Sequence, residues 1–441
     1  MAAIASDGAL GFTWGRRHTL TLLMMLAVAV GYSDRVNMSV AAVAMQQHFA
    51  WSQTMKGAVM AAFFVGYLGF MLVGGLLAAR YGGRRVLGYA VLWWSVWTLL
   101  TPLAAHTSLQ ALIGARIAIG AGEALLFPAT YELASRWAPR NEYTRLTSVT
   151  GSGIPLGTVI GLLGTGWLLT RFDWPSAFYV FGVVGLVWCV VWFAVARDRP
   201  DLDPHLTPAE RALLAREAEP ARTEQDRSWR ALLRHAPVWA LFAAHFANTW
   251  TLYVLLSWLP SYLREVQHMS IGAAGIWSAG PWMAMFLMMY AGAAVTEWVI
   301  RRTGSVATAR KLMQAIGLLG SGALLLSVQA LPLSPAIVLT VLCTATGLLG
   351  LGWSGFSANY LDIAPRHSAM LFAVGNTFGT IPGVVGVTIT GWLIDVTGTY
   401  TAAFALAAGI SVVATLAFVV FGRGRPLLQS EAEPQGTASA A

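Results

Sequence analysis

The sequence predicts an all-α membrane protein with twelve transmembrane helices in two groups of six. Of its 441 residues, 56% are hydrophobic and only 11% are charged, whereas roughly 25% of residues are charged in an average soluble domain. The apolar residues form runs long enough for helices of about 20 residues, the length that crosses the hydrocarbon core of a bilayer. One long polar segment, 197–236, divides these runs six and six.

Apolar runs set the domain organisation. We expect a cytoplasmic N-terminal segment (1–18), a six-helix bundle (19–196), a cytoplasmic linker (197–236), a second six-helix bundle (237–421) and a disordered cytoplasmic tail (422–441). Within the linker, Thr207, Pro208 and Glu210 are typical of a helix start, so a short surface helix and a solvated linker both remain open. The expected spans are 19–45, 55–79, 86–105, 109–135, 146–170, 175–196, 237–261, 272–299, 311–330, 333–361, 366–395 and 399–421.

The basic residues predict the orientation. With both termini in the cytoplasm, most of the 28 Lys and Arg residues fall in cytoplasmic segments. Only Lys56, Arg171 and Arg264 fall in loops on the outer side of the membrane, and Arg35 and Arg116 lie within spans. Basic loops remain in the cytoplasm, so the net charge of +8 follows from topology and predicts no nucleic-acid partner. The two cysteines, Cys189 and Cys343, lie in apolar runs, so we expect neither a disulfide framework nor a metal site.

The first span carries two adjacent charges, Asp34 and Arg35, inside an apolar run that continues to Met45. Such charges are costly in hydrocarbon unless they face a partner or water. They could lie at the outer end of a shorter span, paired with each other or reaching the interface. Alternatively, because helical spacing places Arg35 on one face with Tyr32 and Ser39, this polar stripe could face a cavity, which would indicate a solute or ion pathway.

The fourth span carries a second charged group. Arg116 and Glu123 share a helix face with Gly120, but seven residues of rise, about 10 Å, separate the two charges. Burial disfavours the charged form of a carboxylate, so Glu123 is a candidate proton carrier. A structural ion pair of Glu123 with Arg35 or Arg116 is the alternative, in which case Arg116 would serve as a pairing or gating residue.

The segment after the second span, GLLAARYGGRR (75–85), resembles the signature loop of the major facilitator superfamily, with Ala79 in the acidic position. Four further segments are similar to the anion:cation symporter family, which includes bacterial sugar-acid transporters and the vesicular glutamate, sialin and phosphate carriers. They are YSDRVNMSVA (32–41), RIAIGAGEALLFPATYELASRW (116–137), FANTWTLY (246–253), and NYLDIAPRH (359–367) with GNTFGTIPG (375–383). The likeness covers residues 19 to 421 and implies the major facilitator fold.

This resemblance implies roles for individual residues. Arg35 would bind a substrate carboxylate, Asp34 and Glu123 would take up protons, and the remaining cavity residues would be Tyr32, Tyr67, Asn248, Tyr253 and Asn376. The chain departs from the vesicular glutamate carriers at Asn248, where they have arginine, and at Met60, where they have histidine. The likeness therefore favours a bacterial inner-membrane protein that takes up organic anions over a glutamate carrier.

We therefore expect a monomeric, proton-coupled symporter of a small organic anion, such as a hexonate or hexuronate, with protons and the lipid bilayer as its other partners and no cofactor. An exporter or exchanger of drugs or metabolites on the same scaffold is the runner-up. A membrane enzyme or a transporter-like sensor is a remote alternative, because the polar segments carry no nucleotide loop, HExxH or nucleophile elbow.

Overall fold

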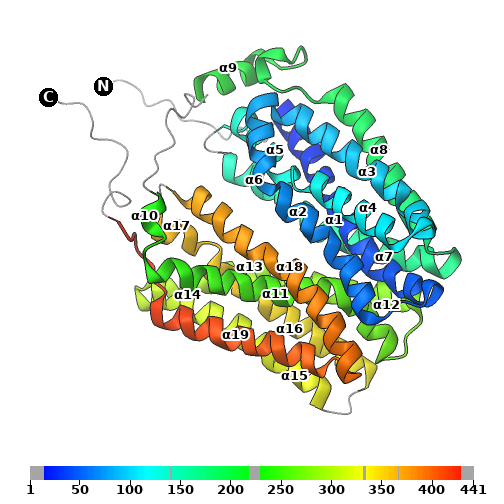
Figure 1. The fold of residues 1–441 in the computed structure, drawn as a ribbon. Helices are drawn as coiled ribbons and strands as arrows, with labels where there is room; N and C mark the ends of the chain where they lie inside the picture. Colours follow the sequence, from blue (N-terminus) through cyan, green and yellow to red (C-terminus); the bar gives the residue numbers. More distant parts are fainter. Residues whose placement is uncertain (1–13, 140–141, 218–228, 331–333, 366, 429–441) are drawn as a thin grey trace, which may run out of the picture.

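A computed structural model describes residues 14–139, 142–217, 229–330, 334–365 and 367–428. These residues form helices joined by turns, and no strand occurs among them. Figure 1 shows two groups of long helices side by side, with the short helices α9 and α10 at one end of the molecule. The first 13 residues and residues 429–441 lie outside the described part of the chain. Disorder is wrong for the first part of the expected tail, 422–428, because Leu427 N–H donates to Ile363 O at 3.0 Å and Leu428 packs on the C-terminal bundle.

The N-terminal bundle and the linker contain helices with these bounds: α1 (Arg16–Phe49), α2 (Gln53–Tyr81), α3 (Gly83–Thr107), α4 (Leu109–Glu123), α5 (Leu126–Trp137), α6 (Tyr143–Gly151), α7 (Gly153–Arg171), α8 (Pro175–Val195), η1 (Pro200–Leu202), α9 (Pro208–Glu217) and α10 (Trp229–Leu232). The C-terminal bundle contains α11 (Ala236–Glu265), α12 (Ile271–Trp277), α13 (Ala279–Thr303), α14 (Val306–Ala315), the π-helical turn η2 (Ile316–Gly320), α15 (Ser321–Ala330), α16 (Pro335–Phe356), α17 (Asn359–Ile363), α18 (Ser368–Thr397) and α19 (Thr401–Phe421).

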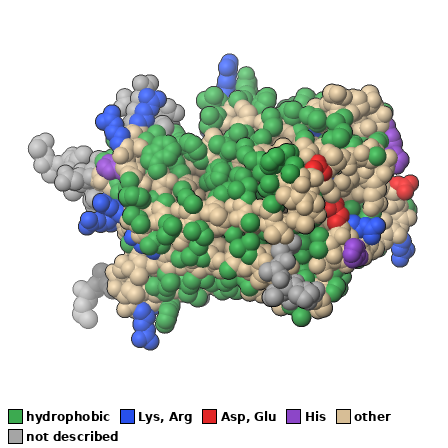
Figure 2. All heavy atoms as spheres, turned by 60° about the horizontal axis from the view of Figure 1, so that its bottom comes forward, with side chains coloured by type: hydrophobic (Ala, Val, Ile, Leu, Met, Phe, Trp, Pro, Cys, Tyr) green, Lys and Arg blue, Asp and Glu red, His purple; other side chains and the backbone are tan. Residues whose placement is uncertain are grey.

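Eleven segments of the described chain are long and apolar enough to cross a membrane. The twelfth expected span is α11, which is 30 residues long but carries polar residues such as His245, Asn248 and Thr249. These side chains are buried inside the protein, where polar groups find partners that lipid does not offer. Figure 2 shows hydrophobic side chains covering much of one face between the two ends of the molecule, as a surface in contact with lipid requires.

Several expected spans are interrupted in the structure, and proline explains three of the interruptions. A proline ring clashes with the carbonyl of the residue four positions earlier and removes one helical hydrogen bond. Pro128, Pro155 and Pro281 accordingly follow breaks at Ala124–Leu125, Ser152 and Ser278, respectively. The first of these breaks comes directly after Glu123, so the expected span 109–135 is one membrane span made of two helices that meet at the residue carrying the charge.

Glycines set how closely helices approach inside the N-terminal bundle. A Cβ atom at Gly120 of α4 would overlap the carbonyl oxygen of Phe63 in α2, and one at Gly66 of α2 would overlap that of Ile117 in α4. Backbones that approach so closely require residues without side chains at the crossing point. This contact fixes the rotation of α4 relative to α2, and therefore the direction of Arg116 and Glu123.

We expect Gly120→Ala to destabilise the protein by about 1–3 kcal/mol, because the added methyl group must push α2 and α4 apart. Thermal unfolding in detergent measures this effect. Gly114→Ala is the matched control: it lies on the same helix, and a Cβ there meets no atom within 4 Å. Equal melting temperatures for the two variants would contradict the close-packing argument.

The linker is attached to the N-terminal bundle, at what we call the linker end of the molecule. Glu210 of α9 accepts hydrogen bonds from the backbone N–H groups of Arg16 and Arg17 at the start of α1. It also forms an ion pair with the Arg17 side chain at 2.9 Å. Arg17 also donates to Glu142 at 2.8 Å, which holds the pKa of Glu142 below its ordinary value. The segment 207–217 is thus a helix that is docked on the bundle.

The segment 75–85 lies at the same end, where the end of α2 and the start of α3 meet at Gly82. Acidic residues from other parts of the chain contact it in place of the acid that Ala79 replaces. Gly82 has a positive φ of 84°, a conformation that glycine adopts at low cost. Asp198 accepts a hydrogen bond from the backbone N–H of Arg84 at 2.9 Å, and Glu132 accepts one from that of Gly83 at 2.7 Å. Two carboxylates, one from α5 and one from the segment that follows α8, therefore cap the start of α3. The uncharged Ala79 of α2 could not do so.

The two bundles meet most closely at the opposite end, which we call the far end and which carries the C-terminal end of α1 and the start of α2. Gly166 of α7 lies against Gly272 of α12, and Gly57 of α2 lies against Val387 and Gly391 of α18. Near the linker end, by contrast, α5 packs on α2 and α3, and α14 packs on α13 and α16, which are helices of the same bundle in each case. The bundles are therefore closed together at the far end.

Candidate substrate and coupling site

Arg35 lies in the middle of α1 and is 6% exposed. Its Nη2 donates to Glu123 Oε2 at 2.9 Å, and both side chains of this ion pair are buried. The guanidinium carbon lies 4.5 Å from the ring centre of Tyr32, 4.7 Å from that of Phe63 and 4.9 Å from that of Tyr67. A guanidinium over aromatic faces gains cation–π attraction, so the three rings stabilise this charge in addition to Glu123.

Glu123 is the last residue of α4 and is completely buried. Its Oε1 has no hydrogen-bond partner, although Oε2 pairs with Arg35. A Cβ at Gly31 of α1 would lie 3.7 Å from the Glu123 carboxylate, so this glycine lets α1 approach the acid. The sequence left two roles open for Glu123, a proton carrier and a member of an ion pair. The structure contains the ion pair with Arg35, and a carboxylate in such a pair can also take up a proton.

Asp34 faces a different helix from its neighbour Arg35. Its Oδ2 accepts a hydrogen bond from Thr98 of α3 at 3.2 Å, and its Oδ1 has no partner. Successive side chains on a helix point about 100° apart, and the structure places one charge against α3 and the other against α4. The alternative in which Asp34 and Arg35 pair with each other at the end of a short span is therefore wrong.

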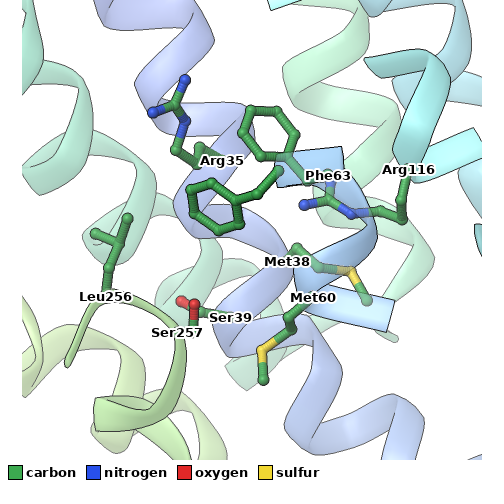
Figure 3. A pocket seen from close by; sticks show the side chains of 9 residues that line it. Arg35, Met38, Ser39, Met60, Phe63, Arg116, Leu256 and Ser257 are labelled. Carbon is green, nitrogen blue, oxygen red and sulfur yellow. The ribbon is translucent and has the colours of Figure 1, made fainter. Parts of the chain in front are cut away.

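Arg116 is 3% exposed, and among the residues that the structure describes it makes no ion pair within 4.0 Å. Its guanidinium carbon lies 5.3 Å from the ring centre of Phe63, so this ring contacts both arginines. Figure 3 shows the Phe63 ring between Arg35 and Arg116. Of the two partners left open for Glu123, Arg35 is the one that pairs with it, because Glu123 is turned toward α1.

A narrow pocket runs beside these side chains, between the two bundles. Arg35 and Arg116 line it from the N-terminal bundle, and Leu256 and Ser257 of α11 line it from the C-terminal bundle (Figure 3). The other lining residues are Met38, Ser39, Met60, Phe63 and Phe64. Ser39 shares the pocket with Arg35, as their helical spacing predicts.

The remaining predicted residues lie at different distances from this group. Tyr32 and Tyr67 contact Arg35 directly, and Tyr253 of α11 packs on Phe64 with ring centres 4.6 Å apart. Asn376 of α18 donates to Met71 Sδ of α2 at 3.3 Å, across the two bundles.

Asn248 lies apart from the pocket. It donates to Ala244 O at 2.8 Å on its own helix, and its Oδ1 would lie 3.7 Å from a Cβ at Gly352, inside the C-terminal bundle. In this arrangement of the bundles, Asn248 is not among the residues beside Arg35.

Sequence reasoning missed Phe63 and Thr98. Phe63 and Tyr67 are four residues apart on α2, and their rings are stacked with centres 5.9 Å apart. An aromatic pair at that spacing in an apolar span is ordinary, so it carries no signal by itself. Thr98 is a buried hydroxyl in a span, and only the packing of α3 on α1 reveals that it serves Asp34.

Comparison with known proteins identifies the family of the chain. The family model for the Major Facilitator Superfamily matches residues 23–387. The chain belongs to this superfamily. It is 35% identical to the chloroplastic sodium-dependent phosphate transport protein 1 of Arabidopsis thaliana, covering 94% of this chain and 80% of that protein. It is 34% identical to the chloroplastic ascorbate transporter of the same plant (94% and 76%) and 32% identical to sialin of Ovis aries (92% and 89%).

Solved structures share the fold. A bacterial homolog of the human lysosomal transporter Spinster, in an inward-facing conformation, superposes with a TM-score of 0.70 at 17% identity, covering 93% of this chain and 96% of that one. The D-xylose–proton symporter gives a TM-score of 0.72 at 14% identity (92% and 98%). The family match and the relatives identify the protein as a multi-pass membrane transporter of this superfamily and not an enzyme.

Proposed function

We propose that the protein is a secondary active transporter that takes up a small organic anion, such as a sugar acid, together with protons. The observation that carries the proposal is Arg35, a buried guanidinium that lines a pocket between the two bundles and whose counter-charge is a single titratable carboxylate. The relatives named as phosphate, ascorbate and sialin transporters support an anionic substrate.

The ion pair supplies a coupling mechanism. While Glu123 is ionised, it occupies Arg35; once Glu123 is protonated, the guanidinium is free to bind a carboxylate through its planar fork of donors. Arg35 Nε and Glu123 Oε1 have no partner, so the site has hydrogen-bonding capacity for a ligand. Asp34, whose Oδ1 is also unpartnered, is the second proton-carrying residue that we propose.

The movement would be alternating access, in which two bundles rock around a central site. One chain supplies both walls of the pocket, so a monomer is sufficient. We place the linker end in the cytoplasm, because the arginines of the loops gather there, and the bacterial inner membrane remains our proposed location. With the bundles closed together at the far end, the structure corresponds to a state closed toward the outside.

Purified protein in proteoliposomes tests the proposal. We expect labelled hexonate or hexuronate to accumulate under an inward proton gradient, with about tenfold accumulation per pH unit for each coupled proton, and a protonophore should abolish the accumulation. Ascorbate, sialic acid and inorganic phosphate complete the substrate panel, and an inward sodium gradient at equal pH is the second driving force. Accumulation that follows only sodium, movement only in exchange for internal anion, or transport of phosphate alone would each refute this assignment.

A further inference from the structure

The far end of the molecule contains a group of polar contacts that joins the two bundles and that transport of an anion at Arg35 does not require. Its centre is Lys56 in the first turn of α2, a side chain that is fully buried. Lys56 Nζ pairs with Glu265 Oε1 at the end of α11 at 2.9 Å and donates to Gln46 Oε1 of α1 at 2.7 Å. The ammonium group also lies 4.9 Å from the ring centre of Trp258.

Glu265 is held by several helices at once. Its Oε2 accepts a hydrogen bond from Gln53 Nε2 at 3.0 Å and from the Tyr400 hydroxyl at 2.8 Å. The carboxylate of the C-terminal bundle thus receives two donors from α2, and one from the residue preceding α19. The two contacts that Gln53 and Lys56 make with Glu265 form only when the start of α2 lies against the end of α11.

A second carboxylate of the C-terminal bundle caps a helix of the N-terminal bundle. Asp395 of α18 accepts hydrogen bonds from the backbone N–H groups of Gln53 and Thr54 at 2.9 and 2.7 Å, and from the Thr54 hydroxyl. The first N–H groups of a helix lack partners within the helix and carry its partial positive charge. The start of α2 is therefore completed by a residue of the opposite bundle.

The backbone of this region is built for close contact between the bundles. A Cβ at Gly57 would lie 3.1 Å from Val387 O and 3.1 Å from the Trp258 ring, and one at Gly391 would overlap Gln53 O. Trp258 Nε1 also donates to Val387 O at 3.1 Å. Glycines on both sides bring α2 and α18 together around the charged group and exclude water from Lys56.

We propose that Lys56, Glu265 and Asp395 form the outer gate of the transporter, which holds the far end closed and must separate completely for that end to open. The proposal rests on alternating access and is independent of which anion is carried. In this ion pair Lys56 is fully buried and Glu265 is 27% exposed. Removing either member leaves the other charge unpaired in a region that is largely shielded from water, which is unfavourable. A single substitution therefore favours the open far end, where the remaining charge is hydrated.

Replacing both members by apolar residues should instead favour the closed far end, because an apolar pair of similar volume removes the cost of burying the charges. Lys56→Met and Glu265→Met alone should open the far end, whereas the double variant should close it again. A merely structural contact would give no such reversal in accessibility.

Thiol labelling measures the opening. The chain has two native cysteines, so Cys189→Ala and Cys343→Ala provide a background in which Ser257→Cys reports on the pocket. A membrane-impermeant thiol reagent is applied to vesicles that hold the protein in either orientation. Labelling of Thr107→Cys, at the exposed C-terminal end of α3, identifies the vesicles in which the far end faces the reagent. We expect labelling from this side to rise roughly tenfold or more in each single variant and to return toward the parent rate in the double variant.

Arg301→Met is the control, because it breaks an exposed pair with Glu297 within α13 that joins no bundles; its labelling rate should equal that of the parent. Unchanged labelling in both single variants, with monodisperse protein, would overturn the gate. Should Lys56→Met fail to fold, Asp395→Asn removes the charge that caps α2. The same thiol labelling should then rise in this variant, and an unchanged labelling rate would overturn the gate. No substrate is present, so this result is independent of whether organic anions are transported.

Discussion

Arg35→Ala is expected to weaken substrate binding by about 100-fold or more and to abolish uptake. A carboxylate on the guanidinium would make two charge-assisted hydrogen bonds, each of which contributes about 1.5–3 kcal/mol, and 1.4 kcal/mol is tenfold in affinity. Binding of a labelled hexonate to the purified protein measures the loss. Arg35→Lys should recover only part of the affinity, because an ammonium group lacks the planar fork that suits a carboxylate.

A double variant separates two explanations for that loss. Arg35 also neutralises Glu123 at 2.9 Å, so Arg35→Ala leaves a buried carboxylate that would repel an anion. Glu123→Gln added to Arg35→Ala removes this repulsion. Binding should stay lost in the double variant if Arg35 holds the substrate, whereas recovered binding would mean that Arg35 serves only to neutralise Glu123.

Glu123→Gln alone is expected to keep binding and counterflow exchange while losing accumulation driven by protons. Glutamine has nearly the shape of the protonated acid, so it leaves Arg35 available for an anion, but it carries no exchangeable proton. Under an inward gradient of one pH unit, the internal-to-external ratio of substrate should fall about tenfold for the proton that Glu123 no longer carries, and to about one where Asp34 carries none. Equal concentrations of substrate on the two sides, with rapid exchange, would be the signature of this uncoupling.

Asp34→Asn is the matched comparison for Glu123→Gln. Both acids are buried in the N-terminal bundle, but Asp34 accepts from Thr98 and is not ion-paired with Arg35. If Asp34 supplies a second proton, its variant should reduce the accumulation ratio without loosening substrate binding. A Glu123→Gln variant that loses binding but keeps proton-driven accumulation would reverse the roles that we assign.

Several parts of the site could be predicted from the chain, and others could not. The apolar runs and the positions of Asp34, Arg35 and Glu123 within them were evident, since charge inside a span is rare and costly. The break after Glu123 was not predicted, although Pro128, four residues past Ala124, provided a readable signal. The position of Asn248 was also missed, because a helix that is buried over most of its surface gives no clear periodicity to show which side faces the pocket.

The sequence by itself determined the membrane class, the number of spans and which ionisable side chains would lie at depth, because these follow from local composition and the cost of charge in hydrocarbon. Only the tertiary structure decided that Arg35 pairs with Glu123, that Phe63 lies between Arg35 and Arg116, and that Lys56 meets Glu265 across the bundles. Those pairings depend on the rotation and separation of whole helices. Contacts of Gly66 and Gly120 set both quantities for α2 and α4, and contacts of Gly57 and Gly391 set them for α2 and α18. Such contacts leave no trace in local patterning.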